Sequence, residues 1–375
     1  GAGNTNIGGA FSVTTFVNNT GTITFDGTNG SIITATNQNL GNIVFDADKT
    51  IGANFTANNL TINSGTLTDG GRTITTEGNW NNIGGTLSAT GSVNLTTGSI
   101  ATISGNTTFN NLSCTINGKT IDLGGNNTIT NFNVSSTVTG QTINITGSNT
   151  FNDFTVTTAG LGQTITFTNG TTQTINGTLT LTGTSGNLIK LRSTAASQWN
   201  IARNGGQSVT FVDVQYGNAT TNDINATTSK NSLFNDDLDA TPHWVFTTAN
   251  LTWQGDDGTN PTRWDVGENW DLGYVPNDTD NVIIPDAGTT PNDPSVNLSV
   301  TVNDLTIQNN GILNCPNGNN ITITNSFVLL GTGATLNIAN PANFISSAPV
   351  TNNGTIVYNG NVTADINFRT YYNLT

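Results

Sequence analysis

The chain has 375 residues, of which only 9% are charged, and 23 acidic against nine basic side chains give a formal net charge of −14. The basic residues are scattered singly, so they cannot build the phosphate-binding stripe of a nucleic-acid-binding protein. No run of about 18 or more apolar residues occurs that would cross a membrane as a helix, and we expect neither nucleic acid as a partner nor membrane insertion.

Strict alternation of polar and apolar residues marks many short segments of the first half of the chain. Residues 142–146, 164–168 and 178–182 are examples, with Thr or Asn at every second position. A period of two with β-branched partners predicts strands that bury one face. Turn signals such as Asn169-Gly170 separate the segments, and no segment has the pattern of an amphipathic helix. The fold is therefore expected to be all-β.

A four-residue motif recurs along the chain and indicates a repeat: Asn or Asp, then Leu or Phe, a polar residue and an apolar one. Its copies occupy residues 59–62, 111–114, 131–134, 153–156 and 304–307. The closest copies are 20 residues apart between Leu112 and Phe132, and 22 apart between Phe132 and Phe154. This spacing suits one coil of a parallel β-solenoid, or β-helix, in which abundant Asn and Thr can stack as ladders. Tandem β-sandwich domains are the alternative.

The apolar residues of this motif are expected to point into one continuous core. They are Leu60, Ile62, Leu112, Phe132, Val134, Phe154 and Val156. Cys114 takes an equivalent place in the motif, which predicts a small apolar core residue. We assign no disulfide to it.

Changes in sequence texture predict two successive modules. From about Leu188 the chain is denser in apolar and aromatic residues, which indicates the thicker closing segment of a first solenoid module, residues 1–247. A second β-rich module, residues 248–375, starts with a Trp-rich cap. Residues 373–375 begin the recurring motif without completing it. We therefore expect the polypeptide to continue into further modules, or copies to self-associate end to end.

The start of the second module resembles a known kind of protein. The likeness rests on Trp253-Gln254-Gly255, Trp264-Asp265, Glu268-Asn269-Trp270, residues 275–285 and residues 302–307. These residues resemble modules of very large bacterial cell-surface repeat proteins, similar to filamentous-haemagglutinin-like β-helix adhesins and to the surface adhesins of gliding bacteria. The resemblance is specific over about residues 251–307. It implies export, an extracellular location at the cell surface and tandem modules, and it implies no catalytic residues.

Catalysis needs titratable groups, and the chain is poor in them. His243 is the sole histidine and lies next to the module boundary, where a packing role is expected. Paired carboxylates at residues 236–237 or 256–257 offer an acid and a base to a polysaccharide lyase or hydrolase. The basic partners that such enzymes use are missing beside them. We therefore expect no enzyme, no catalytic residue and no organic cofactor.

Acidic loops offer candidate calcium ligands, because calcium takes about six to eight oxygen ligands. The candidates are Asp236, Asp237 and Asp239 in one loop and Asp278, Asp280 and Asp286 in another. The calcium-binding repeat Gly-Gly-x-Gly-x-Asp is absent from the sequence. Ordinary solvated turns are therefore the alternative interpretation of these residues.

Four aromatic residues crowd into 22 positions at the start of the second module. They are Trp253, Trp264, Trp270 and Tyr274. If they are exposed, their rings form a platform for sugar binding. If they are buried, they form the small core of a segment that has few regular strands.

The repeat, the low charge and the scarcity of titratable groups favour a non-catalytic structural or adhesive module of an extracellular surface fibre or filament. A carbohydrate-binding or polysaccharide-degrading β-helix module, with surface polysaccharide as its partner, is the competing class of function.

Overall fold

The chain folds into parallel β-strands that stack in successive coils. The computed structural model describes residues 3–17, 21–27, 31–96, 100–114, 120–136, 142–158, 162–232, 234–235, 242–340, 344–346, 350–359 and 373–374. The chain forms two compact units. Unit 1 comprises residues 1–226 and 232–245, and unit 2 comprises residues 227–231 and 246–375. Among the described residues, no helix is long and apolar enough to cross a membrane.

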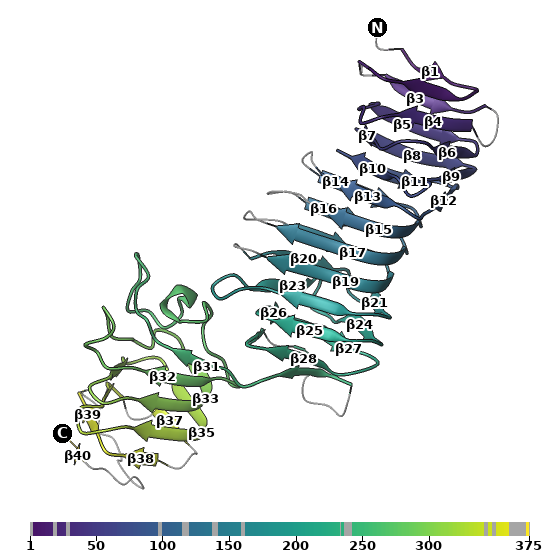
Figure 1. Ribbon diagram of the computed structural model, residues 1–375. Coiled ribbons are helices and arrows are strands. Elements are labelled where there is room, and N and C mark those ends of the chain that lie inside the picture. The colour runs from purple at the N-terminus through teal and green to yellow at the C-terminus, as the bar shows by residue number, and fades with distance from the viewer. Residues whose placement is uncertain are drawn as a thin grey trace. The chain divides into compact units, whose positions relative to one another are not determined.

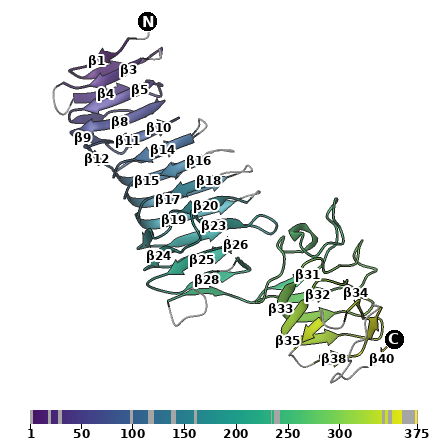
Figure 2. The same cartoon turned by 180° about the vertical axis from the view of Figure 1, so that it is seen from behind.

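Unit 1 is a parallel β-solenoid whose strands return, coil after coil, to the same sheets (Figures 1 and 2). The first sheet runs in the order β1 (Thr5–Asn6), β3 (Thr22–Phe25), β5 (Asn42–Asp46), β8 (Asn59–Ser64), β11 (Trp80–Asn82), β14 (Ile100–Ser104), β16 (Thr120–Leu123), β18 (Thr142–Ile145), β20 (Thr164–Phe167), β23 (Ile189–Ser193) and β26 (Val212–Val214).

A second sheet lies alongside in the same coils. It runs in the order β7 (Phe55–Ala57), β10 (Thr73–Thr76), β13 (Ser92–Leu95), β15 (Thr108–Cys114), β17 (Thr128–Ser136), β19 (Thr150–Thr158), β22 (Leu179–Thr182), β25 (Gln207–Thr210), β28 (Ile224–Thr227) and β30 (Trp244–Phe246). From β19 it branches through β21 (Thr172–Ile175), β24 (Trp199–Arg203) and β27 (Gly217–Ala219). A shorter sheet in the first coils contains β2 (Phe11–Val13), β4 (Ser31–Ala35), β6 (Lys49–Ile51), β9 (Thr66–Thr68) and β12 (Thr86–Ser88).

The alternating sequence pattern decides which side chains form the core. On the first sheet, Ile121 pairs with Ile143 and Ile143 with Ile165 in direct register, and all three are at most 1% exposed. Thr120, Thr142 and Thr164 each precede one of these isoleucines, face outward and are half-buried. The predicted parallel β-solenoid is therefore confirmed, and the β-sandwich alternative is wrong because each strand pairs in parallel with the next coil rather than with a hairpin neighbour.

The recurring motif marks buried core positions, but its copies do not all occupy the same position in the coil. The copies at residues 111–114, 131–134 and 153–156 lie in register on β15, β17 and β19. The copy at residues 59–62 lies on β8, in the other sheet, so the motif occurs in both sheets. The seven apolar residues predicted for the core are all buried, as is Cys114, which confirms that part of the prediction.

A ladder of polar side chains runs inside the solenoid at the turn before the second sheet. The backbone N–H of Thr107 donates to Oδ1 of Asn127 at 3.0 Å, and that of Asn127 donates to Oδ1 of Asn149 at 2.9 Å. The ladder continues from the N–H of Asn149 to Oε1 of Gln173 at 3.2 Å. All four residues are at most 3% exposed, so side chains of neighbouring coils satisfy backbone groups that water cannot reach.

The turn that carries this ladder needs glycine. Gly125 has φ +78°, in the left-handed region, and a Cβ built on it would collide with the carbonyl oxygen of Gly105 in the preceding coil. A side chain at this position would therefore both strain the backbone and push the coils apart.

Unit 2 stacks parallel strands in two sheets. The larger contains β31 (Asn250–Thr252), β32 (Asn281–Ile284), β33 (Val300–Ile307), β35 (Ile321–Leu329), β37 (Phe344–Ser346) and β38 (Val350–Asn352). The smaller contains β34 (Ile312–Cys315), β36 (Thr335–Ile338), β39 (Thr355–Tyr358) and β40 (Asn373–Leu374). Residues 253–280, between β31 and β32, form an irregular segment that includes the single-turn 3₁₀ helix η1 (Gly267–Asn269).

Candidate functional site

The irregular segment of unit 2 is built around the tryptophans that the sequence singled out. Trp264 packs edge-to-face on Trp270 with ring centroids 4.7 Å apart, and Trp253 packs on Trp270 in the same way at 5.0 Å. The three rings are at most 1% exposed and Tyr274 is 3% exposed. The four aromatics therefore pack together as a buried core.

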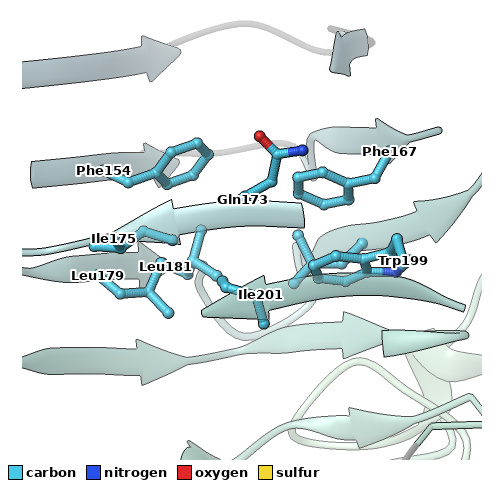
Figure 3. A pocket seen from close by; sticks show the side chains of 9 residues that line it. Phe154, Phe167, Gln173, Ile175, Leu179, Leu181, Trp199 and Ile201 are labelled. Carbon is cyan, nitrogen blue, oxygen red and sulfur yellow. The ribbon is translucent and has the colours of Figure 1, made fainter. Parts of the chain in front are cut away.

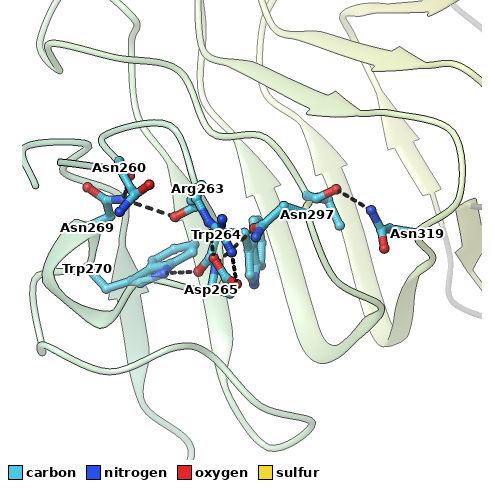
Figure 4. Close-up of polar contacts among 9 residues, drawn as sticks. Asn260, Arg263, Trp264, Asp265, Asn269, Trp270, Asn297 and Asn319 are labelled. Carbon is cyan, nitrogen blue, oxygen red and sulfur yellow. Dashed lines mark hydrogen bonds and ion pairs between the residues drawn. The ribbon is translucent and has the colours of Figure 1, made fainter.

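Hydrogen bonds fix two of the indoles within this core. Nε1 of Trp270 donates to the carbonyl oxygen of Trp264 at 3.0 Å (Figure 4), and Nε1 of Trp253 donates to the carbonyl oxygen of Asn292 at 2.7 Å. Nε1 of Trp264 is buried without a hydrogen-bond partner among the described residues. The rings thus supply apolar area, the Trp270 N–H closes the segment on itself, and the Trp253 N–H connects it to a loop that is distant in sequence.

Asn269 holds the loop around the tryptophans and is completely buried. Its Nδ2 donates to the carbonyl oxygens of Asn260 at 2.9 Å and Arg263 at 3.0 Å, as Figure 4 shows. Its Oδ1 accepts the backbone N–H of Asp257 at 2.9 Å. Its own carbonyl oxygen accepts the N–H of Gln254 at 2.8 Å. One amide side chain therefore replaces the strand pairing that this segment lacks.

An ion pair lies on the outer side of the same loop. Arg263 and Asp265 make a two-point contact, with Nε to Oδ1 at 2.8 Å and an Nη to Oδ2 at 2.6 Å. The hydrogen bond from Arg263 lowers the pKa of Asp265 and raises that of the guanidinium. The backbone N–H of Asp265 also donates to Oδ1 of Asn297 at 3.1 Å (Figure 4). Arg263 is half exposed, so the pair orients the loop more than it stabilises it.

The candidate calcium ligands of unit 2 do not converge. Asp280 is buried, accepts the hydroxyl of Tyr274 at 3.3 Å and the N–H of Asn277 at 3.0 Å, and burial raises its pKa to about 6. Asp278 is exposed. Asp286 accepts Nδ2 of Asn310 at 2.9 Å and the N–H of Gly288 at 2.8 Å, which lower its pKa.

These carboxylates are therefore parts of turns. Across the described ranges, no three His, Cys, Asp or Glu side chains come close enough to hold a metal ion. The other three candidates, Asp236, Asp237 and Asp239, lie outside the described residues.

The residues considered for acid–base chemistry have structural contacts. His243 donates its backbone N–H to Oδ1 of Asp223 at 3.2 Å, and its ring Nδ1 lies 3.4 Å from the same oxygen. Oδ2 of Asp257 accepts the N–H groups of Thr259 at 2.9 Å and Asn260 at 2.5 Å, so it caps a turn. The neighbouring Asp256 is exposed and lines a groove.

That groove is an open surface depression of about 390 Å³ in unit 2. It lies between the residues that follow β31 and the loop that follows β32. Its lining consists of Thr252, Trp253, Gln254, Asp256, Pro285, Thr289, Thr290 and Pro291. Trp253 and Asp256 of the first wall were considered in the sequence for other roles, whereas Thr289 and Thr290 of the second wall were not considered. The pair of prolines, Pro285 and Pro291, that frames a polar loop was the available signal.

A second cavity lies in the core of unit 1, where β21 branches from the second sheet (Figure 3). Its lining is apolar apart from Gln173 and includes Phe154, Phe167 and Trp199. The volume is about 10 Å³, the size of one water molecule at most. Gln173 already uses its amide in the polar ladder, so this space is a packing gap rather than a ligand site.

Comparison with known proteins adds one finding. A family described as a domain of unknown function (DUF8693) matches residues 252–372, which include the tryptophan core, the Asn269 loop and the groove. This part of the chain is similar to that family, and the match covers about a third of the chain. No curated protein and no solved structure matches the sequence.

Proposed function

We propose that the chain is a structural or adhesive module of an extracellular surface fibre and has no catalytic activity. The observation that carries the proposal is the in-register stack of coils in unit 1. Thr120, Thr142 and Thr164 form one outward column, and Asp122, Asn144 and Thr166 form the next. Each coil contacts only its neighbours, so such a stack gains length without needing a larger globular core.

The outward columns support this function by their chemistry. Nδ2 of Asn144 donates to Oδ1 of Asp122 at 2.6 Å, and Nδ2 of Asn131 donates to Oδ1 of Asn111 at 2.7 Å. Side-chain bonds of this kind run along the stacking direction and resist separation of coils. Neutral Thr and Asn surfaces suit a module that lies outside the cell. The proposal includes association of this module with further modules or with other copies of the chain.

Immunogold electron microscopy of intact source cells, with antibodies raised against the chain, tests the proposal. We expect gold particles on fibres at the cell surface, and purified material that forms chains or filaments. Label confined to the cytoplasm, or purified material that consists of discrete monomers at every concentration, would contradict it. Release of reducing sugar from any polysaccharide by the purified chain would favour the catalytic alternative instead.

A carbohydrate-binding role is supported by a separate observation, the groove of unit 2. It does not require catalysis, because a fibre module can adhere through a sugar-binding surface.

A further inference from the structure

The groove of unit 2 presents polar side chains that make no hydrogen bond to the protein. The side chains of Thr252, Gln254, Asp256 and Thr290 line it and have no hydrogen-bond or ion-pair partner among the described residues. Gln254 and Asp256 are exposed, and both threonines are half-buried. Together they offer an amide, a carboxylate and two hydroxyls to one ligand.

The two walls of the groove are joined by hydrogen bonds behind the lining. Nε1 of Trp253 donates to the carbonyl oxygen of Asn292, and Nδ2 of Asn292 donates to the carbonyl oxygen of Gly255 at 2.9 Å. Gly255 has φ +64°, and a Cβ on it would lie 2.5 Å from the Asn292 oxygen. This close approach keeps the walls at a fixed separation, so binding would cost little ordering of the loops.

The charge of the lining restricts the class of ligand. Its one charged residue is Asp256, and no Lys or Arg is among the lining residues. Phosphate, sulfate and uronic acids would meet a carboxylate without a compensating cation, so anionic ligands are disfavoured. A neutral polyhydroxylated ligand both donates to the Gln254 and Asp256 oxygens and accepts from the Gln254 amide and the threonine hydroxyls.

The size and shape of the groove fit the same class. A volume of about 390 Å³ falls at the lower end of the range for small-molecule sites. Because the depression is open, a polymer can pass through it while a few units are held. Pro285 and Pro291 add apolar surface against which the C–H faces of a sugar ring can pack.

We propose that this groove binds a neutral glycan, through hydrogen bonds between sugar hydroxyls and the side chains of Gln254, Asp256 and Thr290: Asp256 accepts, while Gln254 and Thr290 both donate and accept. This inference rests on the proposed adhesive function and names the class of ligand for it. Glycan binding can be measured on the purified chain without any fibre.

The full chain is first applied to an array of neutral, acidic and amino-sugar oligosaccharides, and each bound compound is then titrated by calorimetry. We expect at least one neutral hexose oligosaccharide to bind. Gln254→Ala and Asp256→Asn should each weaken it by roughly tenfold or more, as expected when well-placed hydrogen bonds are lost. Asp278→Asn is the matched control, because it removes the same charge from an exposed site outside the groove, and it should leave affinity unchanged.

Three outcomes would overturn the inference: no neutral glycan binds, only acidic or amino sugars bind, or binding persists in the Gln254→Ala/Asp256→Asn double variant. Both substituted residues are exposed, and the near-ultraviolet circular dichroism of the buried tryptophans reports whether the variants fold. Loss of glycan binding with surface fibres still labelled would refute only the groove. Glycan binding without surface labelling would refute only the fibre.

Discussion

In unit 1 each coil repeats the contacts of the coil before it, whereas in unit 2 residues 253–280 replace regular strand pairing with one buried cluster. The interior ladder of unit 1 uses Asn127 and Asn149 for the same bond in successive coils. In unit 2 the single residue Asn269 makes three such bonds to one loop. A stack held by repeated contacts can lose one of them and keep its fold, whereas a loop held by one side chain depends on that residue.

The largest effect is expected in the apolar core of unit 1, where Phe154→Asp places a charge among rings. Phe154 packs on Phe132 and Phe151 with centroids 5.1 and 4.9 Å away. Losing that packing and burying a carboxylate should cost about 4 kcal/mol or more of unfolding free energy. Urea denaturation followed by far-ultraviolet circular dichroism measures the loss. Asn133→Asp adds the same charge on the exposed face of β17 and should change little; equal destabilisation by both would contradict the assigned inward face.

Asn269→Ala tests the fragile anchor of unit 2. It leaves the N–H of Asp257 and the carbonyl oxygens of Asn260 and Arg263 without their partner, at a cost of about 2 to 4 kcal/mol. Hydrogen exchange with mass spectrometry should show faster exchange over residues 253–280 and unchanged exchange in unit 1.

The control for this anchor is Asn260→Ala, because the Asn260 side chain is exposed and makes no hydrogen bond among the described residues. It should preserve protection of the loop. If Asn269→Ala leaves exchange over residues 253–280 unchanged, the loop is held by the tryptophans alone.

Sequence patterns predicted the parts of this molecule that depend on periodicity. The spacing of Leu112, Phe132 and Phe154 gave the coil length, and alternation identified which residues are buried. Alternation does not say which sheet a strand joins, and the sequence therefore did not predict that the copy at residues 59–62 lies in the other sheet from the copies at residues 111–114, 131–134 and 153–156. The recurrence of Gly125-Asn126-Asn127 as Gly147-Ser148-Asn149 is a signal of the interior ladder that is visible in the sequence.

Local sequence patterns could not predict the groove, and the reason is physical. Its walls are separated in sequence by residues 257–284, and they meet through the contacts of Trp253 and Gly255 with Asn292. Trp253, a candidate for sugar binding in the sequence, is buried and connects the two walls through its hydrogen bond to Asn292. Whether an aromatic ring is exposed or buried depends on contacts with residues distant in sequence, and a local sequence pattern does not reveal these contacts.

Asn127 and Asn126 allow a matched test of the redundant ladder in unit 1. Asn127→Ala removes the acceptor of the Thr107 N–H inside the solenoid and should cost about 1 to 3 kcal/mol. Asn126 accepts the N–H of Ser148 at 2.9 Å on the exposed side of the same turn, where water can replace it. Asn126→Ala should therefore stay within about 0.5 kcal/mol of the parent in thermal or urea unfolding. Equal costs would mean that the interior ladder is solvated.

The smallest effect concerns the buried carboxyl of unit 2 and appears as a dependence on pH. Burial raises the pKa of Asp280 to about 6 in the folded chain, against about 3.9 in an unfolded one. The folded state therefore binds the proton more tightly. Its stabilisation is fully present below about pH 4 and is lost as pH rises through about 6. The lowered pKa values of Asp265 and Asp286 act in the opposite direction and mainly below about pH 4.

Between about pH 4 and 6 we therefore expect unit 2 to lose on the order of 1 to 2 kcal/mol of unfolding free energy from this carboxyl. Asp280→Asn keeps an acceptor for the Tyr274 hydroxyl and removes the titration, so its stability should be flatter over that range. Hydrogen exchange of β31 and β32 at several pH values measures the difference, with Asp278→Asn as the exposed control. If parent and Asp280→Asn show the same slope, the Asp280 carboxyl does not titrate over this range, and burial does not raise its pKa as the contacts of this turn predict.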